Sequence, residues 1–327
     1  FKAACAIPSD PHLKSRSQAQ AGVVTACLAL NQPQRALGYI ERIDDWRRGT
    51  AYADLAMHCL QRGFKTNVEA YLGRALKIAE GAADWRKDRI VGQVAVVRAM
   101  SGPVTDFNAE MATLAKMVSS QQFDALKEAL GTYVRIFNRV YSDIERRTQV
   151  EQCIRASWDK TPGFVRLGLL MDMIEHCLAH SDRTKALDLV KEAREIADSA
   201  SWQPTIEIPL KAKLARLRFL AGDPERAKEE AKEALESFEA KRDRIANVYR
   251  AQTLRPIAEA YRAMDEPDRA CDLYVRALEA GMENPNSRPR AEDLAATCCS
   301  MAVHGTEPSP ALLGRIREIL DGLGDPW

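Results

Sequence analysis

The stretch that decides the fold runs from Leu254 to Ala280 and reads LRPIAEAYRAMDEPDRACDLYVRALEA. Each half carries apolar residues on one side of a helix, and residues 264–267 separate the halves. The apolar positions are Ile257, Ala258 and Tyr261, and then Ala270, Tyr274 and Ala277. Pro267 lies where the second helix would start, a position at which its missing N–H costs nothing. The stretch therefore predicts two short helices joined by a turn.

The same unit recurs along most of the chain, as a search for internal repeats shows. The first core position of each second helix is predicted at Ala36, Val68, Asn108, Gln149, Ala186, Ala227, Ala270 and Leu312. Successive differences are 32, 40, 41, 37, 41, 43 and 42 residues. Two other stretches repeat independently. DWRR at 45–48 returns 39 residues later as DWRK at 84–87, and DLAMHCL at 54–60 returns as DMIEHCL at 172–178.

This pattern resembles the tetratricopeptide repeat, with a small residue in the first helix and alanines seven apart in the second. The copies at 254–280 and 211–238 resemble that family most closely, and the latter includes a Gly-Asp-Pro turn at 222–224. Most units run near 40 residues rather than the 34 of the family. The resemblance implies an all-α, right-handed α-solenoid of about eight antiparallel helix pairs.

The predicted organisation is an N-terminal arm over residues 1–15 and a repeat domain over 16–327. A division of the repeats into two sub-arrays, about 16–160 and 161–327, is an alternative. The chain begins at Phe1 rather than Met, which we interpret as a processed or truncated product. The scattered cysteines favour a reducing compartment such as the cytoplasm, while a processed, exported chain stays an alternative.

Composition narrows the classes of partner. The chain has 47 basic and 46 acidic residues and a formal charge of +1, so no strong net field favours nucleic acid. Its longest nearly apolar stretches, such as 22–30, are shorter than the roughly 18 residues of a membrane span. We therefore expect a protein or peptide partner, or self-association, with no nucleic acid and no membrane insertion.

In the family that the chain resembles, ligands lie along the concave face, against the first helix of each unit. The positions that match this face are Asn138, Tyr141, Arg216, Phe219, Arg255, Glu259 and Arg262. Arg216, Arg255 and Arg262 would form a basic strip suited to the carboxylates of a peptide. Ordinary solvated arginines are the alternative interpretation of the same three residues.

A weak metal candidate comes from Asp172, His176 and His180, which are four residues apart on one side of a helix. Asp54 and His58 repeat the Asp172–His176 pair, so inheritance with the repeat explains it equally well. No fourth ligand follows with fitting spacing. The sequence also lacks the short motifs of zinc ribbons, phosphate loops, EF-hands and serine hydrolases. We therefore expect no cofactor, no metal and no catalytic residues.

These observations lead to three functional hypotheses. The first is a scaffold or adaptor that holds a peptide or partner protein in the concave groove. The second is a structural assembly module of a larger chain or a homo-oligomer. The third, less favoured, is an enzyme built on a helical toroid, which would need converging carboxylates. The adjacent pair Glu229 and Glu230, for example, projects about 100° apart on a helix and does not converge.

Overall fold

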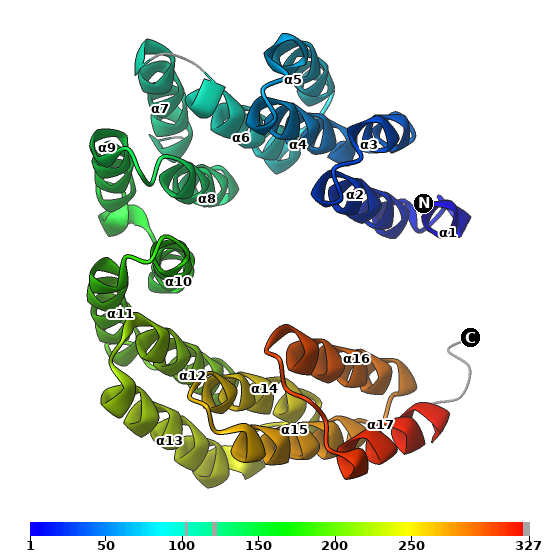
Figure 1. The fold of residues 1–327 in the computed structure, drawn as a ribbon, viewed down its shortest axis with the longest axis vertical. Coiled ribbons are helices and arrows are strands. Elements are labelled where there is room, and N and C mark those ends of the chain that lie inside the picture. The colour runs from blue at the N-terminus through cyan, green and yellow to red at the C-terminus, as the bar shows by residue number, and fades with distance from the viewer. Residues whose placement is uncertain (102–103, 120–122, 323–327) are drawn as a thin grey trace. The chain divides into compact units, whose positions relative to one another are not determined.

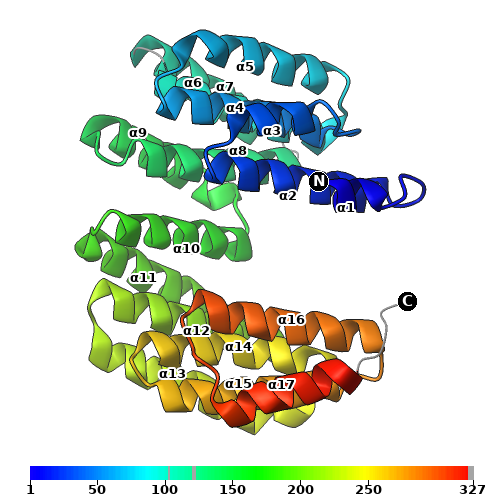
Figure 2. The same ribbon diagram turned by 45° about the vertical axis from the view of Figure 1, so that its right-hand side comes forward.

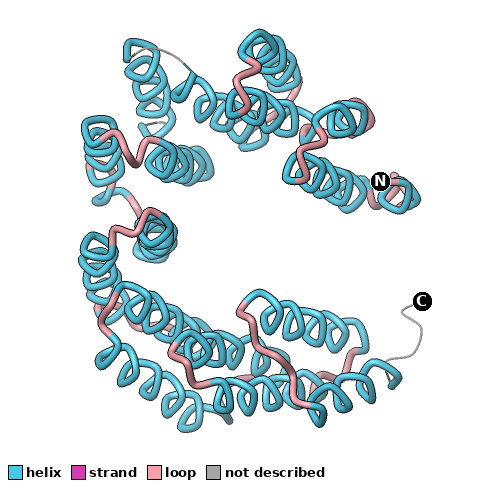
Figure 3. Tube along the Cα trace, viewed as in Figure 1, coloured by secondary structure: helices cyan, strands magenta, loops and turns pink. Residues whose placement is uncertain are grey.

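The computed structural model describes residues 1–101, 104–119 and 123–322, and in these ranges it contains helices and no strand (Figure 3). The chain divides into two compact units, Phe1–Thr161 and Pro162–Trp327. The all-α, solenoid-like architecture predicted from the repeats is confirmed. No helix in the described part of the chain combines the length and the apolar character that crossing a membrane requires.

Unit 1 begins with a short helix and continues as four helix pairs (Figure 1). Its helices are α1 (Lys2–Ala6), α2 (Leu13–Ala29), α3 (Pro33–Ile40), α4 (Arg47–Gln61), α5 (Lys65–Glu80), α6 (Asp84–Ser101), α7 (Val104–Ser119), α8 (Phe123–Arg139) and α9 (Ile144–Arg155), followed by the 3-10 turn η1 (Trp158–Lys160). The first helix of each pair, α2, α4, α6 or α8, packs against the next first helix along the chain. The second helices form the other layer of the unit.

Unit 2 repeats this arrangement with four further pairs (Figure 2). Its helices are α10 (Gly163–Ala179), α11 (Arg183–Asp198), α12 (Pro204–Ala221), α13 (Pro224–Lys241), the 3-10 turn η2 (Arg242–Arg244), α14 (Asn247–Ala263), α15 (Pro267–Met282), α16 (Ser287–Val303) and α17 (Pro310–Gly322). The first helices α10, α12, α14 and α16 form one layer. As predicted, α15 starts at Pro267.

Most turns within a pair use the same backbone solution. A residue with positive φ ends the first helix, and the next N–H reaches back to a carbonyl five residues earlier. This Schellman arrangement satisfies a carbonyl that the helix end leaves open. It occurs at Asn31, Gly63, Ser181, Gly222, Asp265 and Gly305. The shared turn explains why the pairs are alike although only three of these positions are glycine.

The small residues of the repeat lie where the helices cross. The predicted core residues Ala36, Val68, Ala186, Ala227, Ala270 and Leu312 are all buried. Alanine at such a crossing allows the backbones to approach to about 8–10 Å. Cys27, Cys59 and Cys177 are buried at their equivalent positions, as expected of structural thiols.

Two core assignments are wrong by one residue. Asn108 is exposed and Gln149 is only half-buried, whereas their neighbours Phe107 and Val150 are fully buried. The repeat equivalence itself is supported, because the Gln149 side-chain amide donates to the Asn108 oxygen at 3.0 Å. The two residues therefore lie side by side on successive second helices, outside the core.

Residues 1–15, predicted as an arm, contact the first helix pair. The ring of Phe1 stacks on Tyr39 at 4.3 Å between centroids, and the Arg42 guanidinium lies over the same ring. The Gln20 amide also donates to the Cys5 sulfur at 3.4 Å. The start of the chain is thereby attached to α2 and α3.

Candidate binding surface

A row of polar side chains crosses the first helices of unit 2. It consists of Glu175, Arg216, Glu259 and Ser300, one from each first helix, at intervals of 41, 43 and 41 residues. Arg216 lies 3.7 Å from Glu175, and the Ser300 hydroxyl donates to Glu259 at 2.7 Å. We call these four residues the polar row. Since each member comes from the same position of its repeat, the row follows the direction of the solenoid.

One helical turn further on, a second row lies beside the polar row. It consists of Leu178, Phe219, Arg262 and Val303 at the same intervals, and we call it the mixed row. Phe219 is half-buried against the core, whereas Val303 is 79% exposed. Together the two rows offer charged groups next to partly exposed apolar side chains. That combination suits an extended peptide with alternating side chains.

Two of the three arginines of the predicted basic strip tie α14 to α16. Arg255 donates to Asp293 at 2.9 Å, and both side chains are largely buried. Two N–H groups of Arg262 donate to the Gly305 carbonyl at 3.1 and 3.0 Å. Only Arg216 keeps a long, partly exposed contact. The strip is therefore mainly an internal support of unit 2, a role that the sequence interpretation did not include.

His304 joins the polar row at the end of α16, with its Nε2 3.7 Å from a Glu259 oxygen. Burial lowers the pKa of this imidazole, and Arg216 lowers it further, against the opposing effect of Glu259 and Glu175. The Tyr274 hydroxyl lies 2.9 Å from the Ser300 oxygen, and burial raises the pKa of Tyr274 to about 12. The cluster is therefore neutral at His304 and Tyr274 near pH 7.

The two binding residues predicted in unit 1 lie near the end of α8. Asn138 is half-buried on the helix. Tyr141 lies beyond the last helical residue and is only 5% exposed, with its ring edge-on to Phe137 and the Arg147 guanidinium over it. Tyr141 thus packs in a turn rather than on a first helix, which differs from the predicted placement.

The first helices of unit 1 carry their own polar ladder, which sequence analysis missed. Asp54, Gln93 and Thr132 follow one another at intervals of 39 residues. The Gln93 amide donates to Asp54 at 2.5 Å, and Arg135 donates to Thr132 and Glu128, both at 2.7 Å. Burial raises the pKa of Asp54, opposed by the Gln93 hydrogen bond and by Arg135 and Arg89. The repeat interval was the available signal.

The weak metal candidate gains no geometric support. Among the described residues, no group of three or more His, Cys, Asp and Glu side chains is placed to hold an ion. Asp172 and His180 are exposed on α10 and His176 is half-buried. In the matching stretch of α4, Asp54 bonds to Gln93, and burial lowers the pKa of His58.

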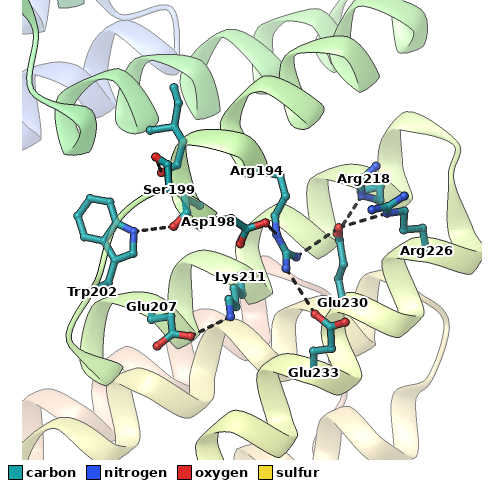
Figure 4. A network of polar contacts seen from close by, with 12 residues as sticks. Arg194, Asp198, Ser199, Trp202, Glu207, Lys211, Arg218, Arg226, Glu230 and Glu233 are labelled. Atoms are coloured by element: carbon teal, nitrogen blue, oxygen red, sulfur yellow. Dashed lines mark hydrogen bonds and ion pairs between the residues drawn. The ribbon is translucent and has the colours of Figure 1, made fainter.

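A buried network of ion pairs lies between α11, α12 and α13, away from both rows (Figure 4). Arg218 and Glu230 are only 4% and 5% exposed in their side chains and pair at 2.9 Å. Arg194 lies 3.3 Å from the second Glu230 oxygen, and Asp223 lies 3.3 Å from Arg218. The buried Glu230 is thus matched by two cations. Such a network supports the layer rather than offering a site.

Comparison with known proteins adds little to this picture. No protein-family model matches the chain, and no curated protein matches it either. The crystal structure of Ton1535 from Thermococcus onnurineus NA1 is 15% identical, with 95% of this chain and 87% of that chain covered, at a TM-score of 0.31. A circular tandem repeat protein with novel repeat topology is 13% identical, with 95% and 76% covered, at a TM-score of 0.22. No function follows from either likeness.

Proposed function

We propose that this chain is a divergent tetratricopeptide-like interaction module whose unit 2 binds an extended peptide across the polar and mixed rows. The observation that carries the proposal is the alignment of these rows with the repeat. Four successive first helices each present one polar-row residue and one mixed-row residue. A peptide that follows the solenoid would therefore meet similar chemistry at every step.

The tetratricopeptide assignment draws support from the buried alanines. In the copy at 211–238, Ala215, Ala227, Ala231 and Ala234 are all fully buried, as the family pattern implies. The intervals near 40 residues correspond to helices of 16–18 residues in α10 to α15. Longer helices extend the face available to a ligand without changing the pairwise packing.

A role in binding rather than catalysis is supported by how the charged groups of unit 2 are used. Arg255, Glu259 and Arg262 all contact groups on, or just beyond, α16, one repeat further along. These contacts fix the layer of first helices in one arrangement. A rigid face reduces the ordering cost of binding a flexible peptide.

The test is a selection from a random peptide library against the purified chain, followed by fluorescence anisotropy with the selected peptides. Phe219→Ala and Glu175→Lys should each weaken binding about tenfold, the effect of one lost contact of about 1.4 kcal/mol. Lys232→Glu on the outer helix α13 is the matched control and should change nothing. If no peptide is selected, or if all three variants bind alike, the proposal is wrong.

A second candidate, self-association, is favoured by the last helix. Leu313 and Leu320 are exposed on α17, 38% and 58% respectively. Terminal repeats of a solenoid usually carry a polar outer side. Size-exclusion chromatography with light scattering across a concentration series would show a dimer that Leu320→Lys abolishes. A monomer at every concentration would exclude this candidate.

A further inference from the structure

The two copies of the Asp-Trp-Arg motif meet in unit 1. Trp46 immediately precedes α4, and Trp85 is the second residue of α6. Their rings lie edge to face, with centroids 5.1 Å apart and planes 78° apart. Edge-to-face contact of this kind is favourable for aromatic pairs. The repeated motif thus builds one aromatic corner from two successive first helices.

Three arginines surround this corner. The guanidinium groups of Arg47 and Arg89 lie 4.8 and 5.8 Å from the Trp46 ring centroid, and that of Arg86 lies 5.1 Å from Trp85. Such cation–π contacts orient a guanidinium group while leaving its N–H edges open. The indoles therefore act as supports for the cations.

The arginines differ in their acidic partners. Arg47 is ion-paired with Asp45. Arg86 and Arg89 are exposed, one turn apart on α6, and within the described ranges no carboxylate lies at ion-pair distance from either. Asp54 acts on Arg89 only through its field, because its own hydrogen bond goes to Gln93. Two oriented guanidinium groups consequently lack an anion.

We propose that Trp85, Arg86 and Arg89 dock an acidic peptide segment of a partner protein. Each guanidinium fork accepts one carboxylate, and the Trp85 indole, 37% exposed, contacts an apolar side chain between the two acids. Two forks held by two different indoles fit two separate carboxylates better than a single phosphate. The site is on unit 1, and it stands or falls independently of the peptide face proposed for unit 2.

The probe is a fluorescein-labelled peptide of alternating glutamate and leucine with blocked ends, measured by anisotropy against the full chain at low salt. Its counterpart with glutamine in place of glutamate is the charge control, and inorganic phosphate is the competitor. Arg86→Gln with Arg89→Gln tests the cations, and Trp85→Ala tests the indole. The matched control is Lys77→Gln with Lys116→Gln, which removes two exposed charges from second helices of the same unit.

We expect the glutamate peptide to bind and the glutamine peptide not to bind. The arginine double variant should weaken binding at least tenfold, since charge-assisted hydrogen bonds are lost. Trp85→Ala should weaken it severalfold, while the lysine control leaves it unchanged. Circular dichroism should show that all variants stay helical.

Three results would overturn the proposal. The first is no binding of the glutamate peptide at low salt. The second is an equal loss in the lysine control, which would indicate unspecific attraction. The third is displacement of the peptide by phosphate at similar or lower concentration, which would indicate an inorganic or phosphorylated ligand instead.

Discussion

The first-helix layers of the two units use arginine in opposite ways. In unit 2, Arg255 and Arg262 donate to acceptors one repeat further along and stabilise the layer. In unit 1, Arg86 and Arg89 stack on indoles, and no carboxylate among the described residues pairs with them. The difference teaches that an arginine on a first helix is available to a ligand only when the next repeat offers it no acceptor.

The largest expected effect would come from removing Glu230, the most deeply buried charge of the network in Figure 4. Glu230→Ala leaves the buried Arg218 without its main partner and should cost unit 2 about 3–5 kcal/mol. Urea unfolding measures the loss, and hydrogen exchange read separately in each unit should place it in 162–327.

The adjacent Glu229→Ala is the matched control, since Glu229 is exposed on the same helix. It should change stability by less than about 0.5 kcal/mol. Equal effects of the two substitutions would show that the buried network contributes nothing particular to unit 2.

The second prediction asks whether the two units pack alike. Ala277 in α15 and Ala75 in α5 occupy the same repeat position and are both fully buried. Ala→Leu at either position should overpack the crossing and cost about 1–3 kcal/mol. Thermal melting measures both. Asp272→Leu, on the exposed side of α15, is the control. A loss in one unit only would mean that the crossings are not equivalent.

Helix pairs, turn positions and most core residues followed from the sequence because they depend on local spacing. Ala270, Tyr274 and Ala277 show this, since one helix period assigns all three to the core, where they lie. Asn108 and Gln149 were misassigned because their units lack the alanine pattern, and a shift of one residue moves the core face by about 100°.

The contacts of the candidate surfaces were not predictable in the same way. The bonds from Gln93 to Asp54 and from Arg255 to Asp293 join residues 39 and 38 positions apart. They depend on how far one repeat turns relative to the next, which no local pattern records. Glu230 looked like an ordinary surface acid in the sequence, because only the approach of α12 and α11 encloses it.

A third, smaller effect separates the arginines of unit 2 from one another. Arg255→Gln breaks a largely buried pair at 2.9 Å and should cost about 1–2 kcal/mol. Arg216→Gln breaks a partly exposed contact at 3.7 Å and should cost no more than about 0.5 kcal/mol. Chemical denaturation distinguishes them. If Arg216→Gln proved as costly as Arg255→Gln, Arg216 too would be an internal support and not a ligand contact.

The smallest effect is a pH response of opposite sign in the two units. Burial holds the pKa of Asp54 above 3.8, so its contribution to unit 1 is complete below about pH 4 and is lost as pH rises through the folded pKa. Burial holds the pKa of His304 below 6.5, so its contribution to unit 2 is present above about pH 6.5 and is lost as pH falls through the folded pKa. Hydrogen exchange compared between pH 7 and pH 5 should therefore show unit 2 losing protection relative to unit 1. His304→Gln should remove that loss, and Asp54→Asn should stabilise unit 1 at pH 7 but not below pH 4. A uniform response of both units would contradict the assignment, because the two buried groups would then not control it.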